Sequence, residues 1–140
     1  MQGLPRRSPN YRRRSIGLLA CNSPLVLLLA SLIYGWIWDR KSDSGVGLAL
    51  TILAVSVGAL NFYLSFVRPS VYHLRYRSME RYHFISGVPV VGTLLVAAGA
   101  TLGFWGSITA LMGICATFLD TGSSFWFLLA TWRDTSFWDA

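Results

Sequence analysis

Four long stretches of the chain are apolar and almost free of charge. They are residues 16–38, 46–67, 88–105 and 108–132, and the one charged residue inside them is Asp120. Crossing the hydrocarbon core of a bilayer takes about 17–25 apolar residues in a helix. Lipid offers no partner for backbone N–H and C=O groups, so a spanning segment must pair them internally. The pattern therefore predicts an all-α membrane protein with four transmembrane helices.

Polar stretches divide the rest of the chain. We expect residues 16–132 to form one transmembrane domain, with a short outer loop at 39–45 and a longer cytoplasmic loop at 68–87. Residues 1–15 are rich in Arg, Pro and Ser, which predicts a disordered cytoplasmic tail. Residues 133–140 are predicted to form a second, shorter cytoplasmic tail.

The longer loop has the pattern of a short basic helix at the membrane surface. Pro69 can open it, and its apolar and aromatic stripe at helical spacing consists of Tyr72, Tyr76, Met79 and His83. Arg77 and Arg81 lie four residues apart, on another face. We expect Arg75, Arg77 and Arg81 to contact anionic headgroups. Docking of a partner protein on this helix is the alternative.

Composition and charge agree with this membrane assignment and give it an orientation. Only 13% of the residues are charged, against about 25% in a soluble domain. Ten of the twelve Lys and Arg residues flank the spans on the side of the two tails, and the outer loop holds only Arg40 and Lys41. Basic segments stay in the cytoplasm. We therefore expect a bacterial inner-membrane protein with both termini cytoplasmic, and we do not interpret the net charge of +6 as a sign of nucleic-acid binding.

Asp120 is the most unusual residue of the predicted spans. It is residue 13 of the 25 in the fourth segment, so it is expected near the bilayer midplane, where an ionised carboxylate is costly. Ser56 and Thr101 have the same predicted depth and are its expected hydrogen-bond partners. Two interpretations stay open. Asp120 takes part in an ion relay, a substrate contact or partner recognition, or it is a protonated residue that holds the helices together.

Other residues of the spans predict contacts between the helices. Asn22 and Asn61 each lie six residues from the cytoplasmic end of a span, so an interhelical hydrogen bond between them is expected. Gly99 and Gly103 are four residues apart, and such small residues let two helix backbones approach closely. The close contact is expected inside one chain, with a homo-oligomer as the alternative.

The sequence offers no convincing enzyme site. Residues 118–124 (Phe-Leu-Asp-Thr-Gly-Ser-Ser) match the active-site signature of pepsin-like aspartic proteases. That chemistry needs two carboxylates, each on a loop of a β fold, whereas a single copy lies here in a predicted helix. Gly and Ser at 121–124 are instead expected to kink or break the helix. The two cysteines lie in spans and suggest no disulfide framework. The two histidines lie ten residues apart with no cluster of Cys or acidic residues, so they suggest no metal site. We expect no enzyme activity and no cofactor.

Two short motifs carry a resemblance to a known class of proteins. They are Ser-Gly-Val-Pro-Val-Val-Gly at 86–92 and Leu-Asp-Thr-Gly at 119–122, joined by a glycine-rich span. Over residues 83–128 the chain resembles small polytopic inner-membrane immunity proteins that accompany secreted bacterial toxins. The resemblance implies binding of a membrane-targeting, pore-forming type of toxin within the bilayer, and it assigns no role to single residues. A small oligomeric transporter or channel that uses Asp120, and an accessory subunit of a larger membrane complex, remain alternatives.

Overall fold

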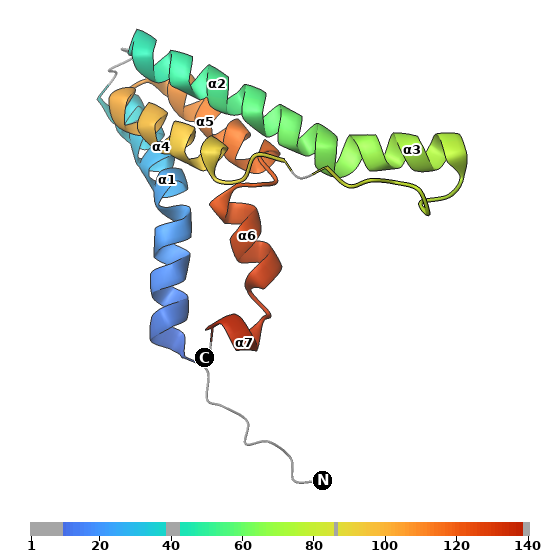
Figure 1. Cartoon of the computed structure of the whole chain (residues 1–140). Helices are drawn as coiled ribbons and strands as arrows, with labels where there is room; N and C mark the ends of the chain where they lie inside the picture. Colours follow the sequence, from blue (N-terminus) through green and yellow to red (C-terminus); the bar gives the residue numbers. More distant parts are fainter. Residues whose placement is uncertain (1–9, 39–42, 86, 139–140) are drawn as a thin grey trace.

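The computed structural model describes residues 10–38, 43–85 and 87–138, and all regular structure in this part of the chain is helical. Figure 1 shows its course. The elements are α1 (Tyr11–Ile37), α2 (Gly45–Phe62), the π-helix η1 (Tyr63–Val67), α3 (Arg68–Tyr76), α4 (Val91–Leu102), α5 (Ser107–Leu119), α6 (Ser124–Thr131) and α7 (Thr135–Trp138). The segments α2, η1 and α3 follow one another without a gap and form a single rod.

Three helical runs are long and apolar enough to cross a membrane. They are Tyr11–Ile37, Gly45–Tyr76 and Ser107–Thr131. The prediction of an all-α, multi-pass membrane protein is thus confirmed for the described residues. The predicted third span, 88–105, is too long, because α4 has 12 residues and a length of about 18 Å. It begins late because the backbone of Val88 pairs with the side chain of Asn61 rather than with a helix.

The predicted fourth span is interrupted in its middle. Helix α5 ends at Leu119 and α6 begins at Ser124, so the expected break at the Gly- and Ser-containing segment is confirmed. Asp120, at the break, has an extended backbone, with φ −76° and ψ 92°.

The predicted surface helix after the second span is only partly right. Helix α3 is the end of the rod rather than a separate element, and it stops where Arg77 takes a left-handed conformation with φ 52°. Met79 and His83 therefore do not extend its stripe, and Arg81 shares no helical face with Arg77. The rod passes Pro69 because the π-helix widens the preceding turn, where a proline ring would otherwise meet the carbonyl four residues back.

Both ends of the described chain are more ordered than the sequence predicts. Helix α1 begins at Tyr11 because the side chain of Asn10 accepts a hydrogen bond from Arg13 N at 3.2 Å, so disorder is the wrong prediction for residues 11–15. At the other end, α7 turns back beside the start of α1 (Figure 1), and the indole of Trp138 donates to Thr131 O at 2.8 Å. Residues 1–9, 39–42, 86 and 139–140, which include parts of both predicted tails and of the outer loop, lie outside the described residues.

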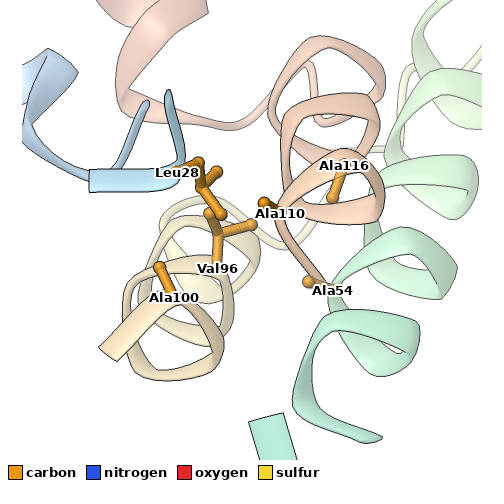
Figure 2. Packing of buried hydrophobic residues seen from close by; sticks show 6 residues of the cluster. All are labelled: Leu28, Ala54, Val96, Ala100, Ala110 and Ala116. Atoms are coloured by element: carbon orange, nitrogen blue, oxygen red, sulfur yellow. The ribbon is translucent and has the colours of Figure 1, made fainter. Parts of the chain in front are cut away.

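The core lies where residues 24–37 of α1 meet α2, α4 and α5, a region that we call the bundle. Figure 2 shows its buried apolar cluster, which consists of Leu28, Ala54, Val96, Ala100, Ala110 and Ala116. Most of these side chains are single methyl groups, so the backbones come close. A Cβ atom built on Gly47 would lie 2.5 Å from Gly103 Cα, and one on Gly99 would lie 2.5 Å from Thr51 Oγ1. The predicted close contact of small residues is therefore made within the chain.

Two extensions leave the bundle in different directions (Figure 1). The first leg consists of residues 11–23 of α1 together with α6 and α7. The second leg consists of η1, α3 and the returning segment 77–85. Asp120 and its neighbours lie where the first leg, the second leg and the bundle meet.

Candidate functional site

The break between α5 and α6 is closed by the side chain and backbone of Asp120. Asp120 N still donates to Ala116 O, at 2.9 Å, as in a helix. The chain then turns, and Gly122 N donates to Asp120 Oδ1 at 3.0 Å while Ser123 N donates to Asp120 O at 2.9 Å. A carboxylate that accepts from the backbone two residues later is a common way to stabilise a turn. The residue that ends α5 thus also shapes the break.

Asn61 of α2 joins this turn to the segment that precedes α4. Its Nδ2 donates to Asp120 Oδ1 at 2.6 Å and to Val88 O at 3.0 Å, and its Oδ1 accepts from Val88 N at 2.8 Å. Asn61 and Asp120 are each only 1% exposed. One amide therefore satisfies a carboxylate oxygen and both polar groups of a backbone residue that has left its helix. We call Asn61, Val88, Gly92, Asp120 and Gly122 the Asp120 site.

The second carboxylate oxygen of Asp120, Oδ2, differs from Oδ1 in having no hydrogen bond among the described residues. Oδ2 is buried and has no hydrogen-bond partner among the described residues, and no ion pair reaches Asp120 there. It lies against the α-carbon of Gly92, where an added Cβ atom would collide with it. Buried polar atoms without a partner are rare and often mark a functional position. Oδ2 is thus the one free binding position of the Asp120 site.

Helix α6 is held to the bundle beside this oxygen. Ser124 Oγ donates to Cys21 O of α1 at 2.7 Å, and Ser124 N donates to Thr93 Oγ1 of α4 at 3.1 Å. These residues, with Gly92 and Asp120, line a cavity of about 10 Å³. Such a volume accommodates about one water molecule. The space next to Asp120 therefore suits a single water and no larger ligand.

The segment that leads into α4 has a strained backbone. Val90 has φ 69°, a left-handed conformation that a β-branched residue rarely adopts. This conformation directs Val90 N to Gly122 O, at 3.1 Å. The strain is therefore part of the contact between residues 87–92 and 119–122, which belong to the two motifs noted in the sequence.

Two predictions are wrong. Ser56 and Thr101 are not the hydrogen-bond partners of Asp120, and Asn22 does not pair with Asn61. Ser56, Thr101 and Asn22 each donate to carbonyl groups of their own helix, at Ile52, at Ala97 and Ala98, and at Leu18 respectively. The predicted depths assumed complete, straight spans. In the structure Asp120 is level with Asn61, which stands 16 residues after the start of α2, a rise of about 24 Å. Asp120 thus lies near the end of the bundle rather than near its middle.

The three arginines expected at the membrane surface lie on the second leg. Arg75, Arg77 and Arg81 are exposed, and none of them is bonded to the Asp120 site among the described residues. The guanidinium of Arg75 lies 5.7 Å from the ring centre of Tyr76.

Several residues of the site could not be found by looking for charge. Val88 takes part through its backbone, and Gly92 takes part because it has no side chain. Ser65 and Thr121 exchange a hydrogen bond of 2.8 Å, and Thr121 Oγ1 also donates to Asn61 O at 3.2 Å. The two motifs at 86–92 and 119–122 were the available signal, since they contain four of the five site residues and the structure brings them together.

An open cleft adjoins the Asp120 site on the side of the second leg. It has a volume of about 380 Å³, and the residues that line it are Asn61, Leu64, Ser65, Phe84, Ile85, Gly87, Pro89, Thr121 and Gly122. Phe84 and Ile85 are 77% and 53% exposed. The cleft therefore combines the hydroxyl groups of Ser65 and Thr121 with the exposed apolar side chains of Phe84 and Ile85.

The described residues contain no group of three or more His, Cys, Asp or Glu side chains that could hold a metal ion. No protein-family model matches this sequence, and no match was found among curated proteins or solved structures.

Proposed function

We propose that this chain is a membrane-embedded immunity protein that neutralises a membrane-targeting, pore-forming type of bacterial toxin by binding it in the bilayer. The observation that supports this best is the cleft beside the Asp120 site. Both segments that carry the resemblance to immunity proteins contribute to its lining, the first through Gly87 and Pro89 and the second through Thr121 and Gly122. The presence of both motifs at one open cleft supports a binding function.

The chemistry of the cleft supports an apolar segment of the toxin as its occupant. Exposed Phe84 and Ile85 give it an apolar surface, and Ser65 and Thr121 give it hydroxyl groups. A helix inserted in lipid gains little from apolar contacts alone, so close fit and a few hydrogen bonds must provide the affinity. The cleft offers both, and the large side chains that face outward elsewhere are suited to lipid.

The arrangement of the ends supports the proposed orientation. The guanidinium of Arg14 lies 5.9 Å from the ring centre of Trp132, and that of Arg13 lies 5.9 Å from the ring centre of Phe137. The beginning and the end of the described chain are therefore neighbours, as expected if both are cytoplasmic. In this orientation the cleft faces the inner leaflet, where a toxin entering from outside completes its insertion.

A protection assay tests the proposal. Susceptible bacteria express this chain and are challenged with the toxin-like product of the neighbouring reading frame, and survival is counted. We expect protection by the wild type and a loss of about tenfold or more with the double variant Phe84→Ala and Ile85→Ala, if each truncation removes about 1 kcal/mol of binding. Leu94→Ala, at a residue of α4 that is 63% exposed, serves as the matched control and should protect fully. Absence of protection by the wild type would refute the proposal.

The free oxygen of Asp120 favours one second candidate, a small oligomeric transporter or channel. Buried acids at helix breaks are a common feature of membrane ion sites, and Oδ2 is enclosed without a partner. Purified protein in liposomes would then carry protons or other ions, and Asp120→Asn would abolish the flux while keeping the side-chain shape. Flux that persists in this variant would exclude Asp120 as the ion site.

A further inference from the structure

The rod that α2 forms with η1 and α3 is long enough to reach beyond the hydrocarbon core. The rod Gly45–Tyr76 has 32 residues and a length of about 48 Å, whereas the core is about 30 Å thick. Arg68 stands 23 residues after Gly45, a rise of about 34 Å. If α2 starts at the outer interface and the rod runs along the bilayer normal, Arg68 reaches the level of the phosphate groups of the other leaflet.

Arg68 is held in place by aromatic rings. After Arg77 the chain returns along the leg and brings Tyr82 to Arg68, whose guanidinium lies 5.6 Å from the ring centre. Tyr82 is itself fixed between Tyr72 and Phe84, with ring centres 5.0 Å and 4.7 Å away. A cation over an aromatic face is stabilised without an acidic partner, so this contact by itself uses none of the N–H donors of Arg68.

Two polar atoms of this contact have no partner. Arg68 Nη1 and Tyr82 Oη are buried, and neither forms a hydrogen bond among the described residues. An enclosed donor without an acceptor costs free energy. A phosphate oxygen satisfies such donors well, because charge-assisted hydrogen bonds from guanidinium to phosphate are short and strong.

We propose that Arg68 and Tyr82 bind the phosphate of an anionic phospholipid headgroup in the cytoplasmic leaflet. Charge complementarity favours a lipid of net negative charge. The leg also carries Arg75, Arg77 and Arg81, and Glu80 is its one acid; each basic residue near an anionic surface adds attraction. The exposed side chains of Val71 and Leu74 are suited to the acyl region next to that headgroup. This inference does not depend on the proposed toxin binding.

Lipid binding by the purified full-length chain tests the proposal. Native mass spectrometry counts phosphatidylglycerol and phosphatidylcholine molecules retained by the protein as each lipid is added to the detergent solution. We expect a preference for phosphatidylglycerol that falls about tenfold in Arg68→Gln and several-fold in Tyr82→Phe, which removes only the hydroxyl group. Arg133→Gln makes the same change of net charge at an exposed residue of the first leg and should leave the preference unchanged.

Three results would overturn the proposal. The first is an unchanged preference in Tyr82→Phe, the variant that preserves every ring contact and decides the matter if Arg68→Gln fails to fold. The second is an equal loss in Arg133→Gln, which would assign the preference to total charge. The third is displacement of phosphatidylglycerol by millimolar inorganic phosphate, which would identify free phosphate as the ligand.

Discussion

The bundle and its two legs are held together by different kinds of contact. In the bundle, glycine, alanine and threonine bring backbones together, as where Gly47 meets Gly103 and Gly99 meets Thr51. In the legs, large rings and arginines meet, as where Arg14 lies over Trp132 and Arg68 over Tyr82. Lipid solvates apolar side chains as well as a protein interior does, so helices inside it associate through close packing. Near the headgroups, aromatic and basic side chains are favoured. The contrast is the one expected between segments deep in lipid and segments near the headgroups.

The difference predicts that the bundle tolerates substitution far less than the legs. The largest effect is expected for Gly47→Leu, because its side chain would meet the backbone of Gly103, which cannot move aside alone. We expect a loss of about 3 kcal/mol or more in the free energy of unfolding, measured by circular dichroism during unfolding in mixed micelles. Gly45→Leu is the matched control, since an added Cβ atom at Gly45 meets nothing within 4 Å. Equal losses in both variants would contradict the close contact.

The next largest effect is expected at the Asp120 site. Asn61→Leu keeps the size of the side chain but leaves Val88 and Asp120 without their partner. We expect a loss of about 2–4 kcal/mol in the free energy of unfolding. Asn22→Leu, which removes a bond within one helix, should cost less than about 0.6 kcal/mol. A similar loss in both variants would restore the pairing of asparagines expected from the sequence.

A smaller loss is expected where Gly92 meets the free oxygen of Asp120. Gly92→Ala places a methyl group against Oδ2, and we expect a loss of about 1–3 kcal/mol from overpacking. Combining it with Asp120→Ser, which shortens the side chain, should recover at least about 1 kcal/mol of the summed losses. A double-mutant cycle of unfolding measures this coupling, and strict additivity would show that the two residues are not in contact.

In the first leg, Trp138→Ala should act locally. The ring of Trp138 lies against Gly17, with a ring-centre distance of 6.3 Å to Trp132, and such interface contacts contribute about 0.5–1.5 kcal/mol. Hydrogen exchange should become faster in residues 12–20, while the midpoint of bundle unfolding stays where it is. A fall of that midpoint as large as in Gly47→Leu would mean that the leg and the bundle unfold as one unit.

The smallest effects are expected for Ser56→Ala and Thr101→Ala. Both hydroxyl groups are exposed and donate within their own helix, so each substitution should change the free energy of unfolding by less than about 0.5 kcal/mol. A loss above about 1 kcal/mol in either variant would revive that residue as a partner of Asp120.

The sequence predicted the features that depend on hydropathy averaged over long segments. It missed those that depend on single hydrogen bonds and ring contacts. Helix class, the first two spans and the break in the last one follow from hydropathy and from the Gly and Ser residues after Asp120. Asp120 was conspicuous because it is the one charge in the spans, and Asn61 was conspicuous as a polar residue in lipid. Their pairing was missed because counting depth along ideal spans cannot foresee that Val88 leaves its helix to bond with Asn61.

The second leg shows the same limit of prediction from sequence. Periodicity extended a helical stripe to His83, but the αL conformation of Arg77 ends the helix first. Nothing in the order of residues indicated that Tyr82 would return to Arg68, since a cation and a ring that meet across a turn have no fixed spacing.

A straight transmembrane helix responds to a thinner bilayer by tilting as a whole, and it carries its neighbours with it. This chain interrupts its last pass at Asp120 and widens another at η1, both at the level where the legs leave the bundle. A change in membrane thickness can therefore be accommodated by a change in the angle between each leg and the bundle. The contacts of the glycines inside the bundle keep their geometry. The bundle can thus keep its packing in membranes of different thickness.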